Sequence, residues 1–210
     1  MPLPLRFGDC DNCKLKGDGP IAWKGPITAP VVILGQSPGT EELLYGAPFC
    51  GQPGKMLDDI LKIVGFDTSQ VLYYNAVQCR PPNDEDIGIK PIEACRPNVE
   101  AVLNYAPRKL VIALGNEAWS SLHRIKKIGG ARVGCGRIAR VEWLSNDEHT
   151  CWAVWSVHPS FVLRNPSWRD EFDNSFHRAY RIFSIGEPER PEAVLHPIPK
   201  TDEEACILIE

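Results

Sequence analysis

Four cysteines of this 210-residue sequence are spaced as two pairs of thiol ligands. Cys10 and Cys13 form a C-x-x-C motif in a polar segment, and Cys79 and Cys95 are separated by fifteen residues, each directly before an Arg-Pro pair. A redox dithiol normally follows a strand and opens a helix, and no strand-like run precedes Cys10. The pattern therefore predicts a four-thiolate metal site. Structural zinc suits such a site chemically, and buried free thiols are the other alternative.

The other four cysteines match no ligand position, and we expect them to be small hydrophobic residues: Cys50, Cys135, Cys151 and Cys206. The first ten residues lack the basic start and apolar core of a signal peptide, and no stretch approaches the roughly 18 apolar residues of a membrane span. We therefore expect a cytoplasmic protein without disulfides or a membrane partner.

A second set of residues suited to chemistry follows an apolar run. Residues 31–34 (VVIL) are continuously apolar, which is typical of a strand covered on both faces. Residues 35–49 then form a polar, turn-rich loop. Because ligands of open α/β sheets bind just beyond the carboxyl ends of strands, this loop is predicted to carry the active site.

Asn75 and His158 also stand at the carboxyl ends of predicted strands. Taken alone, each has an ordinary structural interpretation. An asparagine at a strand end can bond its own backbone, and an isolated histidine is usually a hydrogen-bonded core residue.

Strands and helices alternate along the chain. Strands are predicted at 31–34, 71–77, 110–114 and 151–157, and at the end of a glycine-containing segment, 129–143. Helices are predicted at 56–64 with Gly65 as the C-cap, at 92–105, at 116–122 with Asn116 as the N-cap, and around Trp168, Phe172, Phe176 and Phe183. Residues 80–96 are expected to have little regular structure of their own. This order predicts a three-layer α/β/α sandwich with a largely parallel central sheet.

Four separated motifs closely resemble those of the family 4 uracil-DNA glycosylases. The family writes its first motif as GEAPG, an acidic pair and G-x-PF-x-G, and this chain has GQSPG, TEE and GAPFCG between residues 35 and 51. YYNAVQCRPP at 73–82, LVIALG at 110–115 and HPSFVLRNP at 158–166 follow in the family's order. The resemblance spans residues 10–183. It implies a uracil-DNA glycosylase-like fold and a monofunctional DNA repair enzyme that acts on uracil-containing DNA.

The resemblance also specifies a cofactor. Cys10, Cys13, Cys79 and Cys95 match the family's ligands for a 4Fe-4S cluster, with structural zinc as the alternative. Such a cluster would be structural, because it would tie the N-terminal segment to residues 80–96.

By the same resemblance, residues 35–75 supply a uracil pocket that includes Gly35 and Ser37. Phe49 corresponds to the aromatic residue that stacks on the extruded base. The carboxamide of Asn75 would pair with O4 and N3–H of uracil, a pattern that cytosine does not offer. His158 would donate a hydrogen bond to O2 as uracil leaves as an anion.

The motif after His158 implies contacts with DNA. Ser160, Val162, Leu163 and Arg164 are expected there, the apolar residues as a wedge in the gap left by the flipped nucleotide and Arg164 at phosphates or base edges. A loop packed back on the domain is the alternative for part of this segment.

Charge is distributed unevenly along the chain. The formal charge is −4, but residues 187–210 contain seven acidic and two basic residues, so residues 1–186 carry 20 acidic and 21 basic residues. We expect one monomeric domain at 1–186, able to present a local basic groove to DNA. The acidic, proline-containing tail at 187–210 should have no core, and the sequence identifies no protein partner for it.

One departure from the family motif concerns the reaction itself. Gln36 stands where the family has glutamate, while Glu41 and Glu42 match the acidic pair downstream. We expect Gln36, Glu42 and His158 to be the catalytic residues, with Gln36 positioning water. The alternative is a uracil-DNA-binding or replication-associated protein on the same fold, with weak or lost catalysis.

Overall fold

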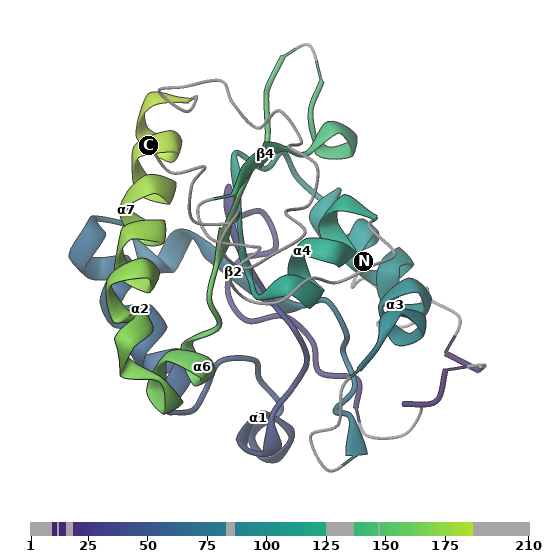
Figure 1. Cartoon of the computed structure of the whole chain (residues 1–210). Coiled ribbons are helices and arrows are strands. Elements are labelled where there is room, and N and C mark those ends of the chain that lie inside the picture. Colours follow the sequence, from purple (N-terminus) through teal and green to yellow (C-terminus); the bar gives the residue numbers. More distant parts are fainter. Residues whose placement is uncertain are drawn as a thin grey trace, which may run out of the picture.

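The structure is a computed structural model of the whole chain, and it describes residues 10–11, 13–15, 19–82, 87–124, 137–146 and 148–186. The predicted tail at 187–210, with Cys206, lies outside the described residues, as do Cys135 and most of the segment predicted as a loop at 129–143. Figure 1 shows the arrangement of the described elements.

Five strands form the central sheet, in the order β2-β1-β3-β5-β4. They are β1 (Val31–Gly35), β2 (Val71–Asn75), β3 (Leu110–Leu114), β4 (Ile138–Arg140) and β5 (Trp152–Ser156). All neighbouring pairs are parallel except β4 and β5. Every residue of β1, β2 and β3 is buried, which confirms for β1 the covering on both faces predicted from its continuous apolar run.

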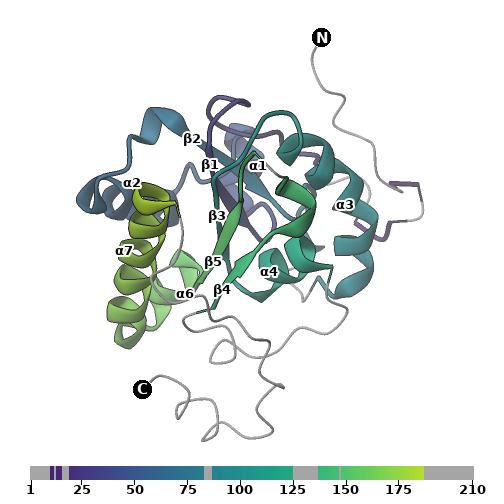
Figure 2. The same ribbon diagram turned by 90° about the horizontal axis from the view of Figure 1, so that it is seen from above.

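Helices cover both faces of the sheet (Figures 1 and 2). One layer contains α2 (Gln52–Val64), α6 (Pro159–Arg164) and α7 (Arg169–Ile185), and the other contains α3 (Ile89–Leu103) and α4 (Asn116–His123). Short 3₁₀ turns occur at Thr68–Gln70, Glu142–Leu144 and Pro166–Trp168. The predicted three-layer α/β/α sandwich is confirmed, and Gly65 caps α2 with a left-handed backbone (φ 105°).

Several predicted boundaries are wrong. The loop at 35–49 contains a short helix, α1 (Thr40–Tyr45), with no buried residue. Helix α3 begins at Ile89, inside the segment expected to be irregular, because Pro91 falls in the first turn, where a helix has no use for the missing N–H. The N-cap of α4 is Gly115 (φ 90°) rather than Asn116, since only glycine adopts this backbone without strain.

Polar contacts fix the sheet at both ends of its strands. At the edge where the strands begin, the fully buried Arg108 donates to the carbonyls of Ile27, Ala29, Val102 and Leu103. It thereby ties the segment before β1 to the end of α3. At the carboxyl ends of the strands, the indole of Trp155 donates to Oδ1 of Asn116 (3.0 Å), so β5 orients the first turn of α4.

No helix among the described residues is long and apolar enough to cross a membrane.

Candidate active site

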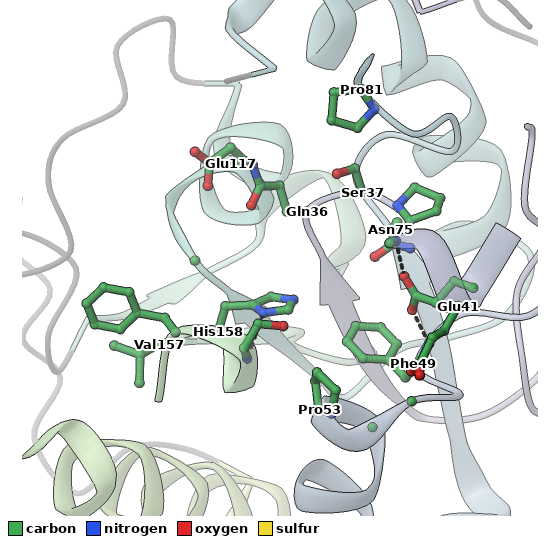
Figure 3. A pocket seen from close by; sticks show the side chains of 18 of the residues that line it. Gln36, Ser37, Glu41, Phe49, Pro53, Asn75, Pro81, Glu117, Val157 and His158 are labelled. Atoms are coloured by element: carbon green, nitrogen blue, oxygen red, sulfur yellow. Dashed lines mark hydrogen bonds between the residues drawn. The ribbon is translucent and has the colours of Figure 1, made fainter. Parts of the chain in front are cut away.

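A cleft of about 590 Å³ opens at the carboxyl ends of β1, β2, β3 and β5. Its lining includes eight residues selected from the sequence: Gln36, Ser37, Glu42, Phe49, Asn75, His158, Ser160 and Arg164. Figure 3 shows Gln36, Phe49, Asn75 and His158 around this opening. The parallel sheet explains the convergence, because parallel strands all end at the same edge.

Gly35 lets two pocket side chains approach the end of β1. It pairs with Asn75 across β1 and β2. A Cβ atom at Gly35 would lie 2.6 Å from Cζ of Phe49 and would also collide with Oδ1 of Asn75. Glycine is therefore required here for space, and it allows an aromatic ring and a carboxamide to share the floor of the cleft.

Phe49 has an unusual backbone for a bulky residue, with φ 54°. Glu42 supports this conformation, because one carboxylate oxygen accepts from the N–H of Phe49 and the other from the N–H of Gly39 (2.6 Å). The pKa of Glu42 is raised overall, because the effect of burial exceeds the opposing effect of the hydrogen bonds from Phe49 and Gly39. Both oxygens of Glu42 are thus engaged by the main chain of the loop.

His158 is the N-cap of α6, and its ring orientation is set by the backbone. The N–H of Ser160 donates to Nδ1 of His158 (3.2 Å), so the proton of the neutral ring resides on Nε2. Burial lowers the pKa of His158 to about 4, and the positive charge of Arg164 adds to the effect. The imidazole is therefore a neutral donor at physiological pH. Its centroid lies 6.2 Å from that of the Phe49 ring, with 29° between the planes.

Asn75 is almost fully buried, and its main chain is fixed by a polar chain from α3. Nε2 of Gln78 donates to the carbonyl of Asn75 (2.7 Å), and Oε1 of Gln78 accepts from Nδ2 of Asn98 (2.9 Å). Gln78 and Asn98 are themselves buried. Neither residue was predicted from the sequence to belong to the site.

The segment after His158 is a helix, which separates its side chains onto different faces. Val162 is 2% exposed and belongs to the hydrophobic core, so the prediction that it forms a DNA-contacting wedge is wrong. Phe161 and Leu163 are half-buried, and Arg164 is exposed. Helix α6 therefore turns Arg164, but not Val162, towards solvent.

The cleft has carboxylates at positions that the sequence analysis did not select. Glu41 and Glu117 line it together with Glu42, and Arg164 is the single basic residue among the described lining residues. The cleft itself is thus not the basic groove expected from the sequence. Glu117 lies in the first turn of α4, and Oε2 lies 3.5 Å from where a Cβ of Gly115 would be. An acidic residue in a first helical turn usually complements the helix dipole, so the sequence carried no functional signal for it.

The four predicted thiol ligands come together away from the cleft. Cys13, Cys79 and Cys95 pack with Leu15, Val77, Ile87 and Ile92 in a small second core. Burial raises the pKa of the Cys95 thiol to about 12, and the neighbouring thiols of Cys79, Cys13 and Cys10 add to the rise. A Cβ on Gly19 would lie 3.3 Å from Sγ of Cys79, so the N-terminal segment also passes close by. The described cysteines form no disulfide, and no three Cys, His, Asp or Glu side chains of the described residues form a ready-made metal site.

Comparison with known proteins identifies the family. Residues 22–183 match the model of the uracil DNA glycosylase superfamily. The chain belongs to this superfamily. It is 32% identical to the type-4 uracil-DNA glycosylase of Pyrobaculum aerophilum, over 78% of this chain and 84% of that protein. It is 28% identical to the type-4 uracil-DNA glycosylase of Archaeoglobus fulgidus, over 85% and 89% of the two chains. The corresponding enzyme of Thermotoga maritima is 29% identical, over 77% and 82%.

The ionisation of His158 gives a test of the site geometry. We expect its ring to titrate near pH 4 in nuclear magnetic resonance spectra, with the signal assigned by its loss in His158→Gln. Because an unfolded histidine has a pKa of about 6.5, the folded state binds fewer protons between these values. The stability advantage of wild type over His158→Gln should therefore decline as the pH falls from about 6.5 to about 4. Titration of the folded ring near 6.5 would contradict the described environment.

Proposed function

We propose that this protein is a monofunctional uracil-DNA glycosylase that removes uracil from DNA by hydrolysing its N-glycosidic bond. The observation that carries the proposal is the convergence of Phe49, Asn75 and the Nε2 edge of His158 in one cleft at the end of the sheet. The type-4 uracil-DNA glycosylases to which the chain is similar support the same activity. No lysine occurs among the described residues of the cleft. This suits attack by water on the sugar rather than attack by an amine nucleophile of the protein.

Base capture would precede chemistry. Uracil is flipped from the stack, its face against Phe49 and its edge against the carboxamide of Asn75. Stacking of this kind contributes about 1 to 3 kcal/mol per base and does not depend on base identity. Discrimination would therefore come from Asn75, because cytosine would leave a buried donor and acceptor mismatched.

Bond cleavage would rely on His158. As the bond from C1′ to N1 breaks, its electron pair leaves with uracil and negative charge grows on O2. Nε2–H of the neutral imidazole donates to this oxygen, a contact that strengthens only as the charge develops. Water then bonds to C1′ of the sugar cation and loses a proton, which leaves an abasic site.

We assign Glu42 a supporting role and place the attacking water near Gln36 and Glu117. The carboxylate of Glu42 is occupied by the backbone of the loop, so it orders Phe49 rather than receiving a proton from water. The strand order puts the end of β3, and hence Glu117, between the strands that carry Gln36 and His158. Gln36 can orient water as a hydrogen-bond partner, and Glu117 can accept its proton.

We further propose that Cys10, Cys13, Cys79 and Cys95 hold a 4Fe-4S cluster. Cys13, Cys79 and Cys95 lie in an apolar shell with Cys10 as a neighbour of Cys95, and four thiolates match the ligand chemistry of such clusters. The cluster would crosslink the N-terminal segment, the end of β2 and helix α3. It would also stabilise Asn75 indirectly, because Asn98, three residues after Cys95 on α3, anchors the Gln78 bridge.

The proposed function is tested with purified protein and uracil-containing DNA, with alkali used to reveal abasic sites. Wild type should produce strand breaks at uracil. Asn75→Asp should act more slowly on uracil and reject cytosine less strongly, since its edge pattern has changed. Unchanged base preference would show that Asn75 is only structural. Tight binding without cleavage would favour the binding-protein alternative.

Single-turnover rates test the effect of having Gln36 at the position where the family motif has a glutamate. A positioned acid or base contributes about 100- to 10,000-fold to a reaction rate. Gln36→Glu should therefore raise the cleavage rate, because it places a carboxylate at this position. Glu117→Gln should lower the rate, and Gln36→Glu should restore part of that loss. Glu41→Gln is the matched control, because it removes a different carboxylate of the same cleft. Equal rates for wild type and Glu117→Gln would remove Glu117 from the mechanism.

Metal analysis tests the cluster. Protein purified without oxygen should contain about four iron atoms per chain, with matching acid-labile sulfide. Cys95→Ser should lose iron and unfold at lower temperature, whereas Cys50→Ser should retain the metal because Cys50 lies outside the thiol core. Zinc without iron in fully active protein would show that the site is a zinc site.

A further inference from the structure

The backbone N–H and the backbone carbonyl of Phe49 each bind a side chain, and the two side chains have opposite charges. Glu42 accepts from the N–H of Phe49, and Nζ of Lys24 donates to the carbonyl oxygen of Phe49 (3.2 Å). Gly54 makes room for that carbonyl, because a Cβ at residue 54 would collide with it. A left-handed phenylalanine persists only where its surroundings determine the backbone, and these contacts do so.

Lys24 is itself positioned by β2. Its N–H donates to the carbonyl of Tyr73 (3.0 Å), and its carbonyl accepts from the N–H of Tyr73 (2.8 Å), so residue 24 adds a bridge to the edge of the sheet. Nζ then lies 4.2 Å from the centroid of the Tyr73 ring, a favourable place for a cation. Lys24 thus reaches the back of the Phe49 loop from a fixed point.

Asp58 of α2 completes this support. The Tyr73 hydroxyl donates to Oδ1 of Asp58 (2.6 Å), and Oδ2 lies 4.0 Å from Nζ of Lys24. The same tyrosine ring lies 5.9 Å from that of Phe49. The side chain of Lys24 is only 33% exposed, unlike a lysine that extends freely into water. Three elements therefore meet behind the stacking residue: the N-terminal segment, β2 and α2.

We propose that Lys24 is a positioning residue for base capture, acting through the backbone of Phe49. With Glu42, it fixes the left-handed turn that holds the Phe49 ring on the floor of the cleft. This inference rests on the proposed function, since it assigns Phe49 the stacking role. It identifies a residue that precedes all four sequence motifs and does not line the cleft.

The variant Lys24→Met tests the inference, because it keeps the length of the side chain and removes the donor and the charge. We expect kcat/KM on uracil-containing DNA to fall by about 10- to 100-fold, the size of effect produced when a site group moves by about 1 Å. The loss should fall mainly on KM, because stacking holds the base before and during cleavage. Lys24→Arg should recover much of it. Lys62→Met, at an exposed lysine of α2, is the matched control and should behave like wild type.

A double-mutant cycle separates positioning from general stability. In the Phe49→Ala background, Lys24→Met should have almost no further effect on kcat/KM, because the ring that it positions is gone. An equal loss in both backgrounds would overturn the inference, as would wild-type kinetics of Lys24→Met. Melting temperatures of all variants show whether each is folded at the assay temperature.

A non-cleavable probe makes the result independent of catalysis. DNA that contains 2′-fluoro-2′-deoxyuridine presents the same base but resists formation of the sugar cation, so its affinity reports base capture alone. Lys24→Met should weaken this affinity by a similar factor, again only when Phe49 is present. If wild type binds the probe but cuts no uracil DNA, the proposed function fails while the binding cycle still decides the role of Lys24. If Lys24→Met binds the probe like wild type, the inference fails whatever the cleavage rate.

Discussion

The close approach at Gly35 is the constraint on which the site depends. The end of β1 must leave space for the Phe49 ring and the Asn75 carboxamide, and a single added carbon would displace both. The two side chains come from different segments, a loop after β1 and the end of β2. The parallel pairing of Gly35 with Asn75 therefore sets the width of the cleft floor.

Each pocket group is held by a hydrogen bond in which at least one partner is a backbone N–H or carbonyl group. Phe49 is fixed by Glu42 and Lys24, Asn75 by the carboxamide of Gln78, and the ring of His158 by the N–H of Ser160. This leaves the functional edges directed into the cleft. Preorganisation of this kind suits a site in which charge develops on the leaving base, since little reorganisation is needed as the bond breaks.

The cysteine core and the cleft are linked through the end of β2. Cys79 directly follows Gln78, whose side chain holds the carbonyl of Asn75, and Cys95 shares α3 with Asn98. A cluster bound by these thiols would brace the same turn from which Asn75 is presented. Its structural role and the recognition of the base are then parts of one arrangement, although the two sites lie apart.

Much of the cleft could be predicted from the sequence because each motif follows its own buried strand. Apolar runs located β1, β2, β3 and β5, and parallel strands necessarily bring Gly35, Asn75 and His158 to one edge. The sheet order was not predictable in the same way, since it depends on how the helices pack against both faces. Local sequence also failed where one backbone position decided the outcome, as at Gly115, which caps α4 in place of Asn116.

The sequence by itself determined the fold class, the family motifs and most of the functional groups that line the cleft, but not Glu117. Only the tertiary structure decided their roles. It engaged both oxygens of Glu42 with the loop backbone, buried Val162 in the core, and brought Lys24 from before the first motif to the carbonyl of Phe49. The physical reason is that a motif specifies residue types along the chain. Burial, charge pairing and close approach are properties of segments that meet only after folding.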